Sequence, residues 1–179
     1  KVLADPDDKR IGVVWHTTGS GKSLSMVFYS GIVARKLGNP TILVINDRND
    51  LDDQLFGTFA AAHEYLQQNP DHAESRGEVR KYMSKNSGGI VFSTIQKFSP
   101  NFDAGEEHMP ILTNRSNVIV MVDEAHRSQY GMQAKLTDNG IRYGYAKYLR
   151  EALPNASFIG FTGTPINTED KSTVAMFGN

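Results

Sequence analysis

The chain has 179 residues, 39% of them hydrophobic and 22% charged, which is enough for one globular domain with its own core. Its formal net charge is −1, so any nucleic-acid contact must come from a local patch. The absence of cysteine excludes disulfides and cysteine-based metal sites and fits a reducing compartment, and no apolar run approaches the ~20 residues of a membrane span.

The first element along the chain is an apolar run over 11–15 that predicts a buried strand, and a helix is predicted over about 22–37. Between them lies His-Thr-Thr-Gly-Ser-Gly-Lys-Ser, residues 16–23, which is typical of a phosphate-binding loop. Lys22 can reach the β- and γ-phosphates of a nucleotide, and the Ser23 hydroxyl can ligate Mg²⁺. The alternative is a Gly-Ser turn with a solvated lysine. His16 stands where the consensus has glycine, so the strand and helix around the loop carry this interpretation.

Further strands and helices alternate along the rest of the chain. Polar residues 68–88 indicate an excursion at the edge of a sheet, and residues 99–117 a surface loop. Continuous apolar strands alternating with helices predict an α/β fold with a mostly parallel sheet and helices on both faces. The remaining strands are expected over 41–45, 89–94, 118–122 and 157–161, and the remaining helices over about 50–67, 74–84 and 131–152.

Two carboxylates follow the strand at 118–122, at the sheet edge where open α/β folds bind ligands. Asp123 is placed to hold Mg²⁺, and Glu124 is the candidate base that orients the attacking water. The alternative is an acidic strand end that faces solvent. His126 is either a surface histidine or a relay between the γ-phosphate and a neighbouring motif.

Two threonines, Thr162 and Thr164, end the strand at 157–161. Their hydroxyls can hydrogen-bond to His126 or to the two carboxylates. The alternative is a turn built by Gly163 and Pro165, with the threonines present for their β propensity.

These motifs, in this order, resemble motifs I, II and III of superfamily 2 helicases and translocases, and the chain is similar to their first RecA-like domain. Trp-His before the loop, Asp-Arg-Asn-Asp-Leu at 47–51, Asp-Glu-Ala-His-Arg-Ser-Gln at 123–129 and Phe-Thr-Gly-Thr-Pro-Ile at 161–166 resemble the motor subunit of type I restriction enzymes. The resemblance implies ATP and Mg²⁺ as cofactors and places the 158–161 strand between the 11–15 and 118–122 strands. It also places Gln54, within motif Ia, on the nucleic-acid side.

The resemblance further implies the role of each site residue. Lys22, Glu124 and His126 would be catalytic, Ser23 and Asp123 would hold the metal, and Arg48, Thr94, Gln96 and Lys97 would contact DNA phosphates, although each of these four could equally be a solvated polar residue. The nucleotide would be bound by Thr18, Gly19, Ser20, Gly21, Lys22, Ser23, Thr162 and Thr164.

We expect residues 1–179 to be one RecA-like motor domain of a longer protein, because the chain lacks an initiator Met. The nuclease site, the second RecA-like domain and the glutamine motif that grips adenine find no match in it. Expected partners are double-stranded DNA, the second RecA-like domain, and the modification and specificity subunits of a restriction complex in the bacterial or archaeal cytoplasm. The alternatives are the same lobe of another superfamily 2 protein, such as a repair helicase or a type III restriction subunit, and a nucleotide-binding module without catalysis.

Overall fold

The computed structural model describes residues 7–17, 19–46, 49–106, 108–125, 135–137, 140–142, 145–163 and 177–178, with the side chains of 49–53, 103, 135–137 and 140–142 left undescribed. The elements, in chain order, are β1 (Arg10–Trp15), α1 (Lys22–Lys36), β2 (Thr41–Asn46), α2 (Asn49–Ala61), α3 (His63–Leu66), β3 (Pro70–His72), α4 (Arg76–Met83), β4 (Ile90–Thr94), η1 (Ile95–Phe98), η2 (Phe102–Ala104), β5 (Val118–Val122), β6 (Lys135–Thr137), β7 (Gly140–Arg142), α5 (Tyr145–Ala152) and β8 (Ser157–Thr162). None of the helices in these ranges is long and apolar enough to cross a bilayer.

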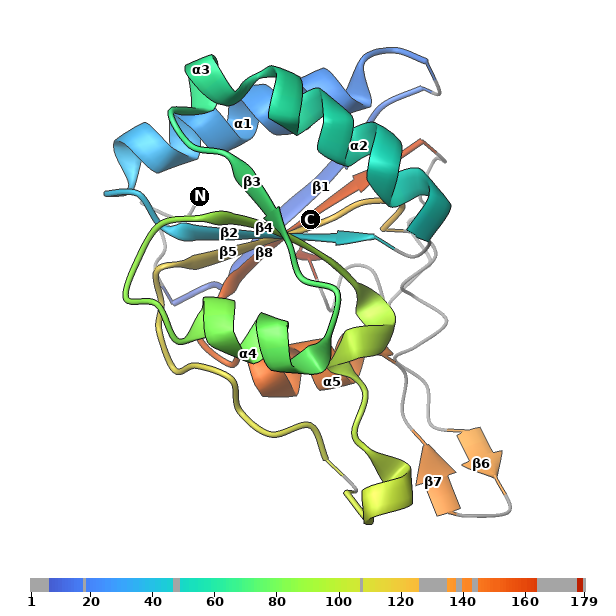
Figure 1. Ribbon diagram of the computed structural model, residues 1–179. Helices are drawn as coiled ribbons and strands as arrows, with labels where there is room; N and C mark the ends of the chain where they lie inside the picture. The colour runs from blue at the N-terminus through green and yellow to red at the C-terminus, as the bar shows by residue number, and fades with distance from the viewer. Residues whose placement is uncertain are drawn as a thin grey trace.

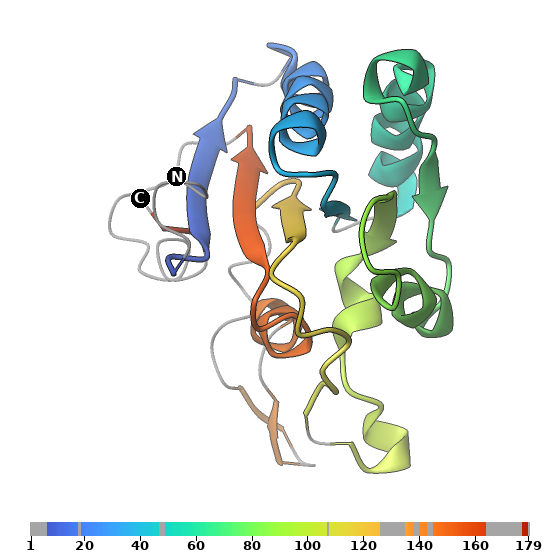
Figure 2. The same cartoon turned by 90° about the vertical axis from the view of Figure 1, so that its left-hand side faces the viewer.

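Six strands form one sheet in the order β1-β8-β5-β2-β4-β3, and every neighbouring pair is parallel. The helices α1, α2 and α3 cover one face of this sheet, and α4 and α5 cover the other (Figures 1 and 2). The predicted α/β fold is therefore confirmed, and so is the position of β8 between β1 and β5. All six carboxyl ends meet at one edge, which gathers the loops that follow the strands.

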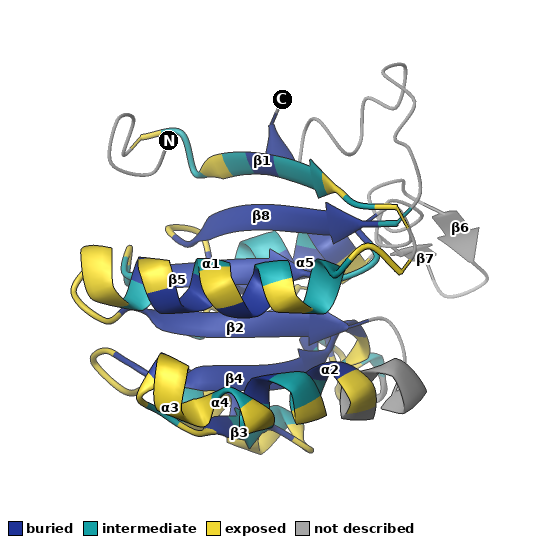
Figure 3. Cartoon of the chain, turned by 90° about the horizontal axis from the view of Figure 1, so that it is seen from above, coloured by how far each residue is buried: buried dark blue, intermediate teal, exposed yellow. Residues whose placement is uncertain are grey.

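Alternate residues of the central strands enter two separate cores, which explains their continuous hydrophobicity. Ile42 and Val44 of β2 pack in the cluster beneath α1 and α2, whereas Leu43 and Ile45 pack in the cluster with α4 and α5. Figure 3 shows the inner strands buried throughout, while β1 at one edge is partly exposed. The carboxyl edge is thus carried by a sheet that is packed on both sides.

Three predicted elements differ in the structure. The predicted helix over 50–67 is interrupted at Ala62, which has φ −96° and ψ 15° and separates α2 from α3. Within residues 68–88 the structure adds the edge strand β3, which sequence analysis missed because Pro70-Asp71-His72 has no apolar alternation. Proline is tolerated at the start of such an edge strand.

The predicted helix over 131–152 is wrong at 135–137 and 140–142. These residues form the antiparallel pair β6 and β7, and α5 begins at Tyr145. The sequence Asp138-Asn139-Gly140 is a typical hairpin signal, and sequence analysis passed over it in favour of helical periodicity.

Candidate nucleotide-binding site

The loop between β1 and α1 is held by hydrogen bonds between its own residues. Gly19 and Gly21 have φ angles of 80° and 92°, in the left-handed region that favours glycine. The Ser20 N–H and hydroxyl both donate to the Thr17 carbonyl, at 3.0 and 2.6 Å. His16 Nδ1 lies 3.2 Å from the Ser20 oxygen and must donate to it, because the serine proton is already used. His16 therefore braces the loop at the position where the consensus has glycine.

The positive end of α1 is left open toward this loop. Its N-cap is Gly21, which supplies no side chain, and its first turn contains no acidic residue. In contrast, α4 is capped by the Ser75 hydroxyl, which accepts from the Glu78 N–H at 3.2 Å. The unpaired N–H groups and the dipole of α1 make its N-terminus suited to an anion.

The strand β8 ties the loop to the rest of the carboxyl edge. Trp15 is in register with Thr162, and the His16 N–H donates to the Thr162 carbonyl at 2.9 Å. Thr162 itself is fully buried. The structure thus brings Thr162 beside the loop, as the sequence predicted, while its role there stays a prediction.

The chain turns sharply where β5 ends. The Asp123 N–H donates to the Ile45 carbonyl and the Ala125 N–H to the Phe161 carbonyl, each at 2.9 Å, so the residues on both sides of Glu124 are fixed to neighbouring strands. Glu124 between them has a φ of 50°, which is uncommon for a residue with a side chain. Its N–H donates to Asp123 Oδ1 at 2.9 Å. This turn holds the two carboxylates at the sheet edge.

Lys22 joins the loop to both carboxylates. Its Nζ lies 2.7 Å from Asp123 Oδ1 and also donates to Glu124 Oε1. The three side chains are 18%, 12% and 23% exposed, so the cluster is largely shielded from water. Burial lowers the pKa of Lys22, but its hydrogen bonds and charge attraction to Asp123 and Glu124 outweigh this and raise the pKa above its ordinary value. The lysine is therefore charged at neutral pH.

A pocket of about 540 Å³ opens over the loop. It is lined by His16, Thr17, Gly19, Gly21, Lys22, Ser23, Leu24, Gln54, Thr58 and Glu124. Gln54 and Thr58 come from α2, and sequence analysis missed both as pocket residues. The resemblance had placed Gln54 on the nucleic-acid side, and only the packing of α2 beside α1 reveals that it lines this pocket.

The residues present fit a nucleotide with Mg²⁺. The glycine loop and the open end of α1 offer N–H donors, Lys22 offers a cation, and Ser23 and Asp123 offer oxygen ligands. Among the described residues there is no group of three or more side chains that could hold a metal unaided. Mg²⁺ needs no such group, because it commonly binds through one or two carboxylates together with phosphates and water.

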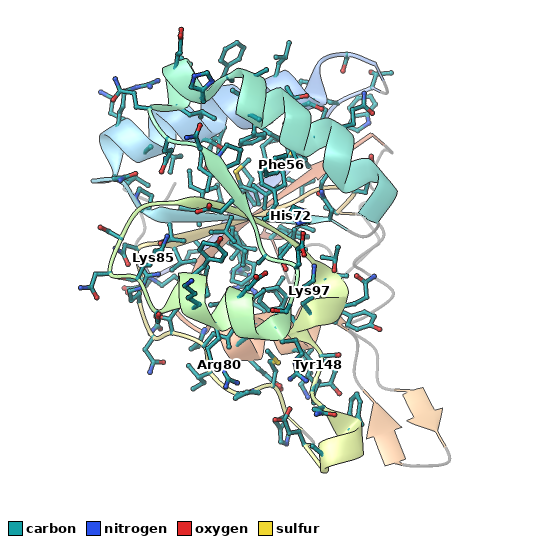
Figure 4. The ribbon with its side chains drawn as sticks, in the orientation of Figure 1. Phe56, His72, Arg80, Lys85, Lys97 and Tyr148 are labelled. Atoms are coloured by element: carbon teal, nitrogen blue, oxygen red, sulfur yellow. The ribbon has the colours of Figure 1, made fainter. Side chains whose placement is uncertain are left out.

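Three predicted DNA-contacting residues, Thr94, Gln96 and Lys97, lie at the end of β4 and in η1. Thr94 ends β4 opposite Asn46 of β2, but only 4% of it is exposed. Gln96 is exposed and Lys97 half-buried on η1, and Figure 4 shows Lys97 below β3, near one end of α4. The structure places these three residues at the same sheet edge as the pocket and outside its lining. Their contacts with DNA stay predictions. The predicted DNA contact of Arg48, the predicted nucleotide contacts of Thr18 and Thr164 and the predicted catalytic role of His126 fall on residues outside the described ranges.

Comparison with known proteins agrees with this geometry. The family model described as SWI2/SNF2 ATPase matches residues 1–179. The chain belongs to the SWI2/SNF2 ATPase family. Its RecA-like fold is shared by solved helicase structures, among them the SWI2/SNF2 ATPase core of Sulfolobus solfataricus in complex with double-stranded DNA, at a TM-score of 0.58 and 18% identity over 99% of this chain and 34% of that one.

Two relatives of this SWI2/SNF2 ATPase chain are restriction-enzyme subunits. The type I restriction enzyme HindI endonuclease subunit of Haemophilus influenzae is 53% identical over 98% of this chain and 17% of its own length. A protein of Methanocaldococcus jannaschii, provisionally named the type I restriction enzyme MjaIXP endonuclease subunit, is 42% identical over 97% of this chain and 15% of its own length. The chain thus spans about a sixth of the length of these relatives, and its resemblance to restriction motor subunits is confirmed.

Proposed function

We propose that this SWI2/SNF2 ATPase domain is the ATP-binding motor of a type I restriction endonuclease subunit, where it couples ATP hydrolysis to movement along double-stranded DNA and so to cleavage. The observation that carries the proposal is the cluster of Lys22, Asp123 and Glu124, in which the lysine directly follows the glycine loop. The 53% identity to a type I restriction endonuclease subunit supports the choice of system.

Each residue of the cluster has a distinct role in this proposal. The Lys22 ammonium leaves the carboxylates to face the β- and γ-phosphates, and Ser23 and Asp123 hold Mg²⁺. Bound Mg²⁺ neutralises phosphate charge. Glu124, whose backbone is fixed on both sides, accepts hydrogen bonds from the attacking water and orients it. Thr18, Gly19, Ser20 and Gly21 cradle the phosphates, while Thr162, Thr164 and His126 connect the site to the end of β8.

The DNA track and the partners complete the proposal. The residues that contact DNA phosphates are Arg48, Thr94, Gln96 and Lys97. Because Thr94 is only 4% exposed, only its small accessible surface is available for such a contact. A second RecA-like domain supplies the arginine fingers, so the 179-residue chain alone should hydrolyse ATP negligibly, because such fingers contribute about 10³–10⁵-fold in rate. Modification and specificity subunits join the complex, which acts on double-stranded DNA in the cytoplasm of a bacterium or archaeon.

A single substitution separates nucleotide binding from hydrolysis in the full-length subunit. Glu124→Gln keeps the side-chain size and leaves Asp123 in place, so it should retain ATP and DNA binding but lose hydrolysis. Cleavage should fail with it, although the nuclease site is untouched. Lys22→Ala should impair both binding and turnover. An ATPase rate near that of the wild type in Glu124→Gln would show that another residue acts as the base.

A further inference from the structure

Two residues that line the nucleotide pocket come from α2. Gln54 and Thr58 lie four residues apart, on one face of this helix, and both line the pocket that also contains Gly19, Gly21 and Lys22. No role in nucleotide binding follows for either residue from the sequence motifs. Their position raises the question of what α2 contributes to a bound nucleotide.

Of these two residues, Gln54 has hydrogen-bond donors available for a ligand. The Thr58 hydroxyl donates to the Gln54 carbonyl at 3.0 Å, so its proton is used within the helix. The Gln54 side chain is exposed, and among the described residues its carboxamide makes no hydrogen bond. A carboxamide carries two N–H donors. In a pocket already lined by a lysine and backbone N–H groups, those donors suit the oxygens of a phosphate.

The part of α2 that follows Gln54 is packed against the sheet. Leu55 and Phe59 are 4% and 0% exposed in the core beneath the helix. Phe56 meets Phe92 and His72 edge-on, with ring centroids 5.2 and 5.6 Å apart, and Figure 4 shows Phe56 pointing from α2 toward His72. These contacts fix the face of α2 that carries Gln54 toward the pocket.

The same helix begins next to the predicted DNA-contacting segment. Arg48 directly precedes Asn49, the first residue of α2, and Gln54 follows five residues later. Five residues of helix span about 8 Å. A single helix therefore runs from a segment expected to contact DNA to the nucleotide pocket.

We propose that Gln54 is a positioning residue that donates hydrogen bonds to the phosphates of the bound nucleotide and thereby couples nucleotide binding, through α2, to DNA binding. The inference rests on the proposed function, since it requires that ATP occupies this pocket. It gives α2 a role on the nucleotide side in addition to the DNA side.

The test compares Gln54→Ala and Gln54→Glu with the wild type in the full-length subunit, using a non-hydrolysable ATP analogue and a double-stranded DNA. Gln54→Ala should weaken analogue affinity about tenfold, because a hydrogen bond to a charged group is lost. Gln54→Glu should weaken it further, because a carboxylate of the same shape repels phosphate. In both variants the change in DNA affinity caused by the analogue should shrink. Glu64→Ala, which alters an exposed residue of α3 outside the pocket, is the matched control and should change nothing.

The controls separate this inference from the proposed function. If the wild type fails to bind the analogue, or if Lys22→Ala binds it as well as the wild type, the proposed function is overturned. If those two behave as expected but Gln54→Glu binds the analogue like the wild type, only the role of Gln54 is overturned. Equal thermal unfolding of the Gln54 variants and the wild type without nucleotide would exclude a purely structural effect.

Discussion

Replacing Lys22 by methionine should destabilise the nucleotide-free chain, because two neighbouring carboxylates would lose the cation between them. Removing one partner of a buried ion pair costs about 3–5 kcal/mol, and removing an exposed one costs about 0–1 kcal/mol. Lys22 and Asp123 are 18% and 12% exposed and lie 2.7 Å apart, so the pair falls between the two cases. We therefore expect a loss of about 2 kcal/mol, equivalent to a fall of about 6 °C in Tm for a chain of this size.

Thermal unfolding at neutral pH, in EDTA and without nucleotide, measures this loss. EDTA is needed because Mg²⁺ could replace the ammonium between the carboxylates, and adding Mg²⁺ should restore part of the stability of the variant. Lys85→Met is the matched control. Lys85 lies 4.0 Å from Asp71, with both side chains almost half exposed, and its loss should change Tm by about 3 °C or less. Equal Tm values for the Lys22 and Lys85 variants would refute the reasoning.

Three further predictions concern packing, pH and DNA. A methyl group added by Gly160→Ala would lie 2.8 Å from the Ala125 side chain, so the free energy of unfolding measured in urea should fall by about 1–3 kcal/mol. Gly57 lies in α2 with open space around it, so Gly57→Ala should raise the free energy of unfolding by up to about 1 kcal/mol. Burial raises the pKa of Tyr29 from 10.0 to about 12, so the unfolded chain loses the phenol proton first and the free energy of unfolding should fall as pH rises from 10.0 toward 12. Tyr29→Phe should remove the contribution of this proton to the fall. An unchanged pH dependence of stability in Tyr29→Phe would contradict the prediction. Lys97→Ala in the full-length subunit should weaken binding to all DNA sequences alike and reduce the salt dependence of log Kd by about one unit, whereas a loss confined to some sequences would contradict a phosphate contact.

The sheet could be predicted from the sequence because each of its inner strands is a continuous apolar run. Such runs appear only where both faces of a strand are covered, and β2, β4, β5 and β8 are indeed buried throughout. The strand β3 has no such signal, since Pro70-Asp71-His72 pairs on one side only, at the sheet edge. The hairpin of β6 and β7 was missed because helical periodicity was extended across a turn signal.

The candidate site could be predicted where its functional residues stand next to one another in the sequence. The glycine loop, Lys22 and the pair of carboxylates each stand in a short motif at a strand end, and the structure joins them through Lys22. Gln54 could not be assigned to the pocket, because its position depends on how α2 packs against the sheet through Leu55 and Phe59. The bracing role of His16 likewise depends on the Ser20 rotamer and its bond to Thr17.

The most direct test of motor function measures how the ATP hydrolysed per bound duplex depends on duplex length in the full-length subunit. Duplexes of increasing length are supplied at the same molar concentration, so the number of loading sites stays constant. A motor that steps along DNA consumes ATP for as long as track remains, so hydrolysis should rise with length until dissociation limits it. An ATPase that DNA only switches on would hydrolyse the same amount at every length. That length-independent result would contradict translocation.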